Sequence, residues 1–132
     1  MNTKTVGDIS EAMVLAALVR VGKNVLIPWG DNLRYDMAYD EGGKLIRIQC
    51  KTARDLGNGS LEFPASSCTA HRGTGRKNYR GEIEFFGVYA PSTQKVYLVP
   101  VDDVGINSAT LRVEPSKNGQ KRNMRWAENY VV

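Results

Sequence analysis

The stretch LRYDMAYDEGGKLIRIQCKTA, residues 33–53, decides the fold of this chain. Apolar and polar residues alternate in its second half, which reads Ile46, Arg47, Ile48, Gln49, Cys50 and Lys51. An alternation of period two predicts a strand with one buried face and one polar face. The turn-forming run DEGG, residues 40–43, precedes this strand. The stretch therefore predicts a β-hairpin.

The register of this hairpin places a carboxylate on the polar face. If residues 40–43 form a four-residue loop, Tyr39 pairs with Lys44 and Asp36 lies opposite Arg47. Antiparallel partners share a face, and the side-chain period is two. Asp36 is therefore expected on the same side as Gln49 and Lys51, unless a bulge intervenes.

The length and composition of the chain limit the possible fold class, domain count and partners. A chain of 132 residues with 42% hydrophobic and 24% charged residues predicts a single globular domain over residues 1–132. The net charge of +4 and the pI near 9.2 permit a polyanionic partner without requiring one. Ribosomal and membrane-surface proteins would share this charge.

Cysteines and the N-terminal sequence predict a soluble, intracellular protein. Cys50 and Cys68 are the two cysteines of the sequence, and both are expected to be reduced thiols. The start MNTKTVGDISEAM has no basic and apolar signal-peptide pattern, and no segment resembles a membrane span.

Other segments predict an α/β chain with a mixed sheet. Residues 8–21 predict a helix that ends at Gly22, with Asp8 or Ser10 as N-cap and Glu11 completing a capping box. Residues 66–80 predict a loop, alone or after a short helix, and 117–122 a basic loop. Strands are expected at 24–29, 61–63, 83–89, 95–101 and 109–113, and a short closing helix at 124–130. Trp29 and Trp126 are expected in the core or at an interface.

Four residues make a constellation suited to phosphodiester hydrolysis: Glu11, Asp36, Gln49 and Lys51. Hard divalent cations prefer oxygen ligands, which Asp36 and Gln49 supply and Glu11 could complete. Such an ion stabilises charge on phosphorus oxygens and lowers the pKa of a bound water. Lys51 could position that water or neutralise developing charge.

An ordinary structural role competes for each of these residues. Glu11 alone is more simply part of a capping box, and Asp36 could pair with Arg34 or Arg47. Gln49 and Lys51 alone are an ordinary solvated strand face. The combination on one predicted face favours the functional interpretation.

The arrangement of Glu11 on the first helix, Asp36 before a hairpin and Gln49-Cys50-Lys51 on the next strand resembles the PD-(D/E)-x-K nuclease superfamily. It is most similar to the homing endonucleases of bacterial, cyanobacterial-type group I introns. The segments IEFFGVY, KVYLVPVDDV and RWAE extend the likeness over most of the chain. Tyr35 stands where the motif has proline, and Gln49 stands where most of the superfamily has Glu or Asp.

This resemblance implies a restriction-endonuclease-like core, a central mixed sheet flanked by helices, and a metal-dependent, sequence-specific homing endonuclease for double-stranded DNA. It implies Mg²⁺, or another divalent cation such as Mn²⁺, held by Asp36, Gln49 and Glu11, with Lys51 also catalytic. It further implies a homo-oligomer, dimer or tetramer, in the bacterial cytoplasm near the nucleoid. Candidate DNA-binding residues are Arg72, Arg76, Lys77, Asn78, Arg80, Lys117, Lys121 and Arg122.

Three other functions stay open at this level. A Holliday-junction resolvase shares the superfamily, although Gln49 counts against it. A non-catalytic DNA-binding module would result if the nuclease site had decayed through Gln49. An RNA-binding protein could use the same basic loops, since net charge does not tell RNA from DNA.

Overall fold

The computed structural model describes residues 1–30, 32–68, 76–115 and 124–132. Its centre is a mixed five-stranded sheet in the order β1-β2-β3-β8-β9. These strands are β1 (Asn24–Leu26), β2 (Met37–Glu41), β3 (Lys44–Thr52), β8 (Phe85–Ala90) and β9 (Lys95–Pro100). Strand β3 pairs antiparallel with β2 and parallel with β8. The predicted α/β fold with a mixed sheet is confirmed.

Helix α1 (Thr3–Arg20) covers one face of this sheet. It begins five residues earlier than the sequence predicts, because Asn2 is the N-cap and its side chain accepts a hydrogen bond from Thr5 N at 2.8 Å. The capping-box interpretation of Asp8, Ser10 and Glu11 is therefore wrong. The predicted end is confirmed, since Gly22 follows with a φ of +87°.

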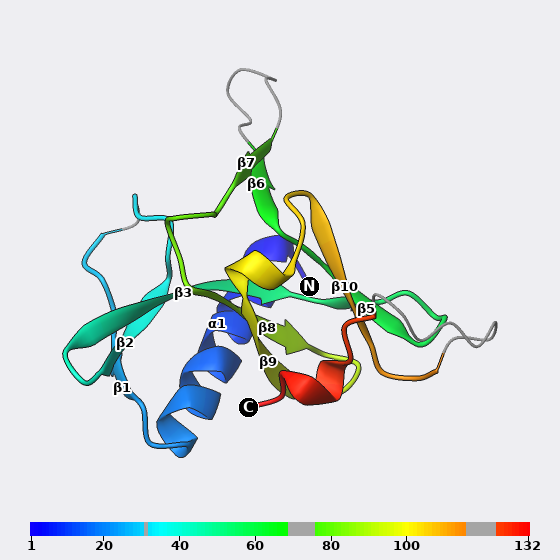
Figure 1. The fold of residues 1–132 in the computed structure, drawn as a ribbon, viewed down its shortest axis with the longest axis horizontal. Coiled ribbons are helices and arrows are strands. Elements are labelled where there is room, and N and C mark those ends of the chain that lie inside the picture. Colours follow the sequence, from blue (N-terminus) through cyan, green and yellow to red (C-terminus); the bar gives the residue numbers. More distant parts are fainter. Residues whose placement is uncertain (31, 69–75, 116–123) are drawn as a thin grey trace.

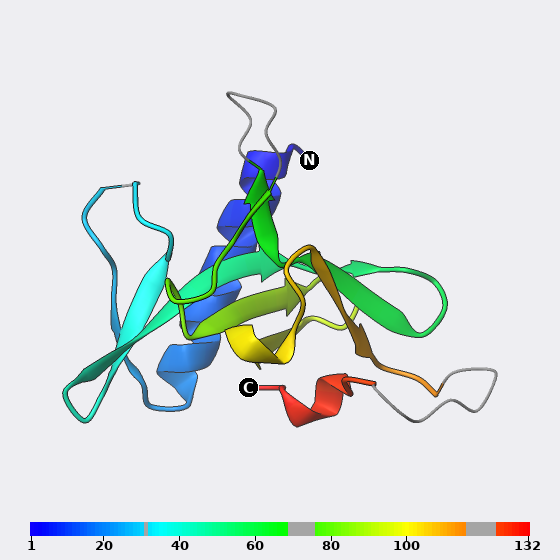
Figure 2. The same cartoon turned by 45° about the horizontal axis from the view of Figure 1, so that its top comes forward.

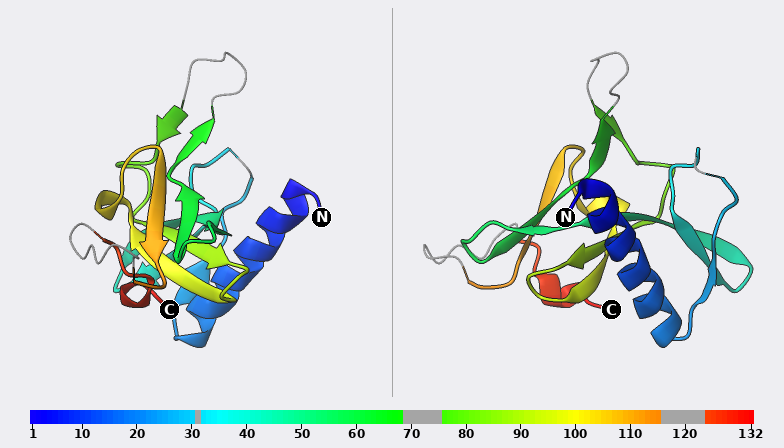
Figure 3. Two further views of the ribbon diagram at one scale, coloured as in Figure 1. Left: turned by 90° about the vertical axis from the view of Figure 1, so that its right-hand side faces the viewer. Right: turned by 180° about the vertical axis from the view of Figure 1, so that it is seen from behind.

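The opposite face carries no second α-helix in the described part of the chain. It is covered by the three-stranded sheet β10-β5-β4 and two 3₁₀ segments, η1 (Val101–Asp103) and η2 (Ala127–Asn129). The small sheet consists of β4 (Arg54–Asp55), β5 (Ser60–Pro64) and β10 (Ser108–Arg112). Figure 3, left, shows α1 on one side of the central sheet and β10 on the other.

The central hairpin turns more tightly than expected. Gly42 and Gly43 form a two-residue turn with φ values of +61° and +94°, so that Glu41 pairs with Lys44. The predicted pairing of Tyr39 with Lys44 is wrong, and Tyr39 pairs with Ile46 instead. Because the error is two residues, the side chains of the hairpin keep their predicted faces.

Two short strands lie within residues 66–80, where a loop or a short helix was expected. Strands β6 (Ser66–Cys68) and β7 (Arg76–Asn78) pair antiparallel, and this two-stranded unit projects from the body of the molecule (Figures 1 and 2). Arg72, Lys117, Lys121 and Arg122 lie outside the described residues.

Several smaller expectations differ from the structure. The strand expected at residues 24–29 ends at Leu26, and Trp29 is fully exposed rather than in the core. The closing helix is only the short η2. Strands expected near residues 61–63, 83–89, 95–101 and 109–113 are present as β5, β8, β9 and β10. Among the helices described, none is long and apolar enough to cross a membrane.

Candidate active site

The candidate site lies where β3 continues beyond the end of β2. The last pair of the β2–β3 ladder is Met37 with Ile48, whereas β3 pairs with β8 as far as Thr52. Among the described residues, one edge of β3 therefore has no strand partner after Ile48. Asp36 fills the start of this gap, since its N–H donates to Ile48 O at 2.8 Å and its Oδ2 accepts from Cys50 N at 2.8 Å. The strand edge thus fixes the Asp36 carboxylate.

Glu11 approaches the same carboxylate from the middle of α1. It is half-buried and lines a cavity of about 290 Å³ together with Asp36, Cys50 and Lys4. Burial raises the pKa of Glu11, and the charge of Asp36 and a hydrogen bond to it raise that pKa further. The structure therefore brings two carboxyl groups together, and the ordinary role of Glu11 as a helix cap is excluded.

Gln49 and Lys51 flank Cys50 on β3. Their side chains leave the face of β3 opposite to Ile48 and Cys50, which pack toward α1. Gln49 Nε2 donates a long hydrogen bond of 3.4 Å to Cys50 O. Within the described residues, no hydrogen bond or ion pair joins either side chain to Asp36. The convergence of all four residues therefore stays a prediction.

Lys51 has a partner that the sequence did not reveal. Its Nζ donates to the Tyr79 hydroxyl at 3.2 Å and lies 4.9 Å from the centre of that ring. The Arg34 guanidinium lies 3.8 Å from the same ring centre. Tyr79 is 4% exposed. The buried ring therefore holds Lys51 beside a second cation.

Arg34 connects this cluster to the β6–β7 hairpin. Its guanidinium donates to the Ser67 hydroxyl and to the carbonyl oxygen of Asn78, the latter at 2.8 Å, and its Nε lies 3.1 Å from Glu82 Oε2. Arg47 is likewise engaged, with its Nε donating to Glu84 Oε1 at 3.0 Å. Neither arginine pairs with Asp36, so the ordinary ion-pair role considered for Asp36 is excluded.

The described basic residues near the hairpin have contacts of their own. Lys77 Nζ lies 3.6 Å from Glu82 Oε1, and an Arg80 guanidinium nitrogen donates to Val104 O at 2.9 Å. Asn78 Oδ1 accepts from Arg80 N at 3.1 Å. Arg76 lies on β7 opposite Cys68. Lys77 is exposed, and its ammonium makes one long ion pair within the part of the chain that the structure describes, so it is able to reach a phosphate.

The donor set fits a hard cation only in part. No group of three or more His, Cys, Asp or Glu side chains is placed to hold a metal ion within the described residues. Asp36 and Glu11 nevertheless supply two neighbouring carboxylates, and Mg²⁺ is commonly held by one or two carboxylates plus substrate oxygens and water. Burial, followed by the charge of Asp36, raises the pKa of Glu11, and the nearby Lys4 lowers it. A divalent cation bound by the two carboxylates would add positive charge beside them.

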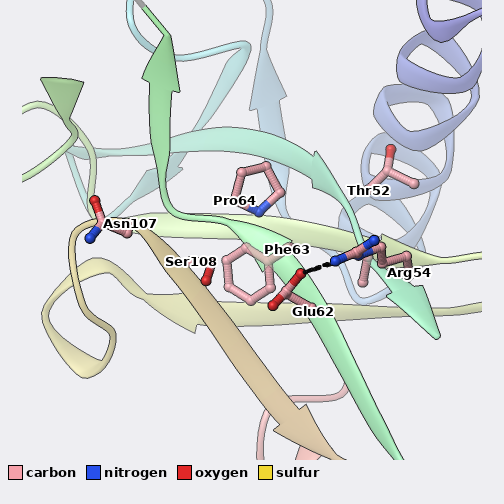
Figure 4. A pocket seen from close by; sticks show the side chains of 8 residues that line it. Thr52, Arg54, Glu62, Phe63, Pro64, Asn107 and Ser108 are labelled. Atoms are coloured by element: carbon pink, nitrogen blue, oxygen red, sulfur yellow. Dashed lines mark hydrogen bonds and ion pairs between the residues drawn. The ribbon is translucent and has the colours of Figure 1, made fainter. Parts of the chain in front are cut away.

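A larger cavity lies elsewhere. It has a volume of about 450 Å³ and is lined by residues of β4, β5 and the start of β10 together with Thr52, Ala53 and Asn107. Figure 4 shows the ion pair between Arg54 and Glu62, 2.7 Å apart, at this cavity. Neither carboxylate of the candidate site lines it.

Comparisons with known proteins agree with this arrangement. A search of curated proteins gave no match. Among solved structures, a bacterial homing endonuclease, I-Ssp6803I, is similar to this chain with a TM-score of 0.78 and 28% sequence identity. The likeness covers 99% of this chain and 89% of that chain. The resemblance drawn from the sequence is confirmed.

The family itself is shown by the match of a family model. The model describes the PD-(D/E)XK endonucleases, and it matches residues 1–132, which is the whole chain. The protein belongs to the PD-(D/E)XK endonuclease family, and it is a nuclease.

Proposed function

We propose that this nuclease is a metal-dependent homing endonuclease that cuts double-stranded DNA at a specific sequence. The observation that carries the proposal is the Asp36 carboxylate, fixed by Cys50 N at the free edge of β3 and joined there by Glu11. The similarity to a bacterial homing endonuclease over 99% of the chain supports the homing assignment.

In this proposal Asp36, Glu11 and the amide oxygen of Gln49 hold Mg²⁺ or Mn²⁺. When bound, the ion lowers the pKa of a water molecule and stabilises charge on the scissile phosphate. Lys51 places its ammonium group beside the attacked phosphate, where it neutralises developing negative charge. Tyr79 keeps that ammonium in place through its hydroxyl and its ring.

DNA approaches over the projecting β6–β7 hairpin and the basic segments around it. Lys77 and the other candidate cations give affinity through phosphates, whereas arginine and asparagine side chains in the major groove give sequence choice. A chain of 132 residues spans only part of a long recognition site. Two copies therefore act together, each cutting one strand.

The deciding experiment measures cleavage of DNA that carries candidate intron-insertion sequences, with Mg²⁺, with Mn²⁺ and with a chelator. The parent protein is expected to cut only with a divalent ion. Lys51→Ala is expected to bind DNA and lose cleavage, because the ammonium acts on the reacting phosphate. Lys44→Ala is the matched control, since Lys44 is exposed at the hairpin turn of the same strand.

Other outcomes of the experiment would support other functions. Preferential cutting of four-way junctions over linear duplexes would replace homing by junction resolution. Binding of DNA without any cleavage, by both the parent and Lys51→Ala, would indicate a DNA-binding module.

A further inference from the structure

Arg34 lies in the loop between β1 and β2, two residues before Asp36, and its side chain is largely buried. The exposed fraction of that side chain is 22%, which is low for an arginine. One guanidinium nitrogen donates to the Ser67 hydroxyl, and the other donates to Asn78 O at 2.8 Å and to Lys77 O at 3.2 Å. The guanidinium is therefore engaged by atoms of the protein itself rather than presented to a phosphate.

These partners of Arg34 lie on both strands of the β6–β7 hairpin. Ser67 belongs to β6, whereas Lys77 and Asn78 belong to β7. Within the described residues, β6 and β7 pair with each other and with no strand of the five-stranded sheet. Figures 1 and 2 show this two-stranded unit projecting from the body of the molecule. One side chain thus bonds both strands of the hairpin to the loop that leads to Asp36.

The same guanidinium also lies over the ring of Tyr79, the residue that follows β7. Arg34 Cζ is 3.8 Å from the centre of the ring. Phe86 packs edge-on against this ring, with the two ring centres 5.5 Å apart. The Tyr79 hydroxyl in turn accepts the hydrogen bond of 3.2 Å from Lys51 Nζ. Arg34 therefore helps to set the position of the ring, and the ring sets the position of the Lys51 ammonium.

Glu82 joins Arg34 to the exposed cation of the hairpin. Its Oε2 lies 3.1 Å from Arg34 Nε, and its Oε1 lies 3.6 Å from Lys77 Nζ. When Lys77 turns to a phosphate, Glu82 loses the more distant of these two partners and keeps Arg34. The contact between Arg34 and Glu82 is therefore compatible with DNA on the hairpin.

We propose that Arg34 is a positioning residue that fixes the Lys51 ammonium relative to the base of the β6–β7 hairpin. DNA held by the hairpin and the ammonium that acts on its phosphate are then kept at one spacing, which raises the rate of the chemical step without adding DNA affinity. An arginine suits this role because its planar fork bonds several acceptors while its face covers a ring. The inference rests on the proposed function, in which Lys51 acts on the reacting phosphate.

The first test needs no DNA. NMR of ¹³C-labelled lysine side chains reports the place of Lys51, because the ring current of Tyr79 shifts the signals of nearby methylene groups. Arg34→Ala is expected to move the Lys51 signal toward that of an exposed lysine. The milder Arg34→Lys should move it in the same direction, since an ammonium lacks the planar fork. Identical Lys51 signals in the parent and in Arg34→Ala would overturn the proposal.

Arg47→Ala is the matched control for these variants. The Arg47 side chain is 34% exposed and pairs with Glu84, so it resembles Arg34 in burial and in having a carboxylate partner. Within the described residues, Arg47 makes no hydrogen bond to Tyr79 or Lys51. Arg47→Ala is therefore expected to lower the Tm while the Lys51 signal stays in place.

The second test measures kcat and the Kd for DNA separately, with Mg²⁺ present. Arg34→Ala is expected to lower kcat by about tenfold and to leave the Kd nearly unchanged, because Lys51 loses its fixed position while the phosphate contacts remain. Millimolar guanidinium chloride should restore part of this kcat, relative to the same concentration of NaCl, by filling the vacated site. It should not raise the kcat of Arg47→Ala.

Two results of the cleavage test would overturn the proposal. One is an equal loss of kcat in Arg34→Ala and Arg47→Ala, which would indicate a general effect on the fold. The other is a weaker Kd for DNA with kcat unchanged, which would make Arg34 a DNA contact. If the parent cut no DNA, the proposed function would fail, and the Lys51 signal would still decide whether Arg34 places Lys51.

Discussion

The Asp36 carboxylate and the backbone N–H of Cys50 form a hydrogen bond of 2.8 Å at the point where β3 extends past β2. A carboxylate therefore occupies a position that a paired strand would otherwise fill. This bond holds Asp36, which lies in the loop just before β2, in place at the edge of β3. Asp36 therefore lies beside Cys50, the residue between Gln49 and Lys51.

Restoring a carboxylate at Gln49 tests the metal assignment. Gln49→Glu adds a negative oxygen ligand, and we expect the Mg²⁺ concentration for half-maximal cleavage to fall by about tenfold. Without metal, the same variant should have a lower Tm, because a third anion joins Glu11 and Asp36. Gln49→Ala should raise the Mg²⁺ requirement instead. A Mg²⁺ titration that is the same for all three proteins would exclude Gln49 as a ligand.

The Glu11 carboxylate should lower the stability of the folded protein when no metal is present. Its pKa is raised by burial and then by Asp36, so the ionised form is disfavoured in the folded protein at neutral pH. Glu11→Gln is expected to raise the metal-free Tm by on the order of one or two degrees. It should also reduce the gain in Tm that Mg²⁺ or Mn²⁺ gives to the parent. Asp102→Asn removes an exposed carboxylate of η1 and should change neither value.

The Tyr79 hydroxyl should affect catalysis more than DNA binding. Tyr79→Phe keeps the ring between Arg34 and Lys51 but removes the hydrogen bond to Lys51 Nζ. We expect kcat to fall by about tenfold with KM nearly unchanged, because Lys51 loses its fixed position. Tyr97→Phe is the control, since that buried hydroxyl bonds Thr93 at 2.9 Å rather than Lys51. Equal losses in both variants would point to a general effect on the fold.

The Arg47–Glu84 pair should make stability depend on acidic pH. Hydrogen bonds from the Arg47 side chain are the largest cause that lowers the pKa of Glu84 below its ordinary value of 4.5. The pair therefore stabilises the folded state above pH 4.5, and this contribution is lost as the pH falls through the lowered pKa. Glu84→Gln is expected to cost about 1 kcal/mol at pH 7. Urea unfolding should show this difference vanish in strong acid, whereas a difference that persists there would contradict the ion-pair explanation.

Sequence patterns predicted the sheet around the site better than the contacts within the site. Alternation along β3 gave the faces of Gln49 and Lys51, and the even error in the turn left the side chains of the β2–β3 ladder on their predicted faces. Asp36 lies just before that ladder, and its convergence with Gln49 and Lys51 stays a prediction. The β6–β7 hairpin was missed because residues 66–80 show no apolar alternation, and its base is held by Arg34 from a distant segment. The contact of Tyr79 with Lys51 was also missed, because it depends on tertiary packing between segments that are far apart in the sequence.

A close approach of α1 to the sheet sets the position of Glu11, and Gly87 permits it. A Cβ atom at Gly87 would lie 2.7 Å from Val14 Cγ1 and 2.8 Å from Ile48 Cγ2, which no real contact allows. Gly87→Ala should therefore push α1 away from β8, destabilise the protein by about 1–3 kcal/mol and reduce cleavage together with metal binding.

Gly7 offers the matched comparison, because a Cβ atom there would meet nothing within 4 Å. Gly7→Ala lies in the same helix and should stabilise the protein by about 0.5–1 kcal/mol through its higher helix propensity. Thermal unfolding and Mg²⁺-dependent cleavage would be measured for both variants. If Gly87→Ala lowered the Tm but left the Mg²⁺ requirement unchanged, the packing of α1 would not control Glu11. The role of Glu11 in metal binding would then not depend on how closely α1 packs against the sheet.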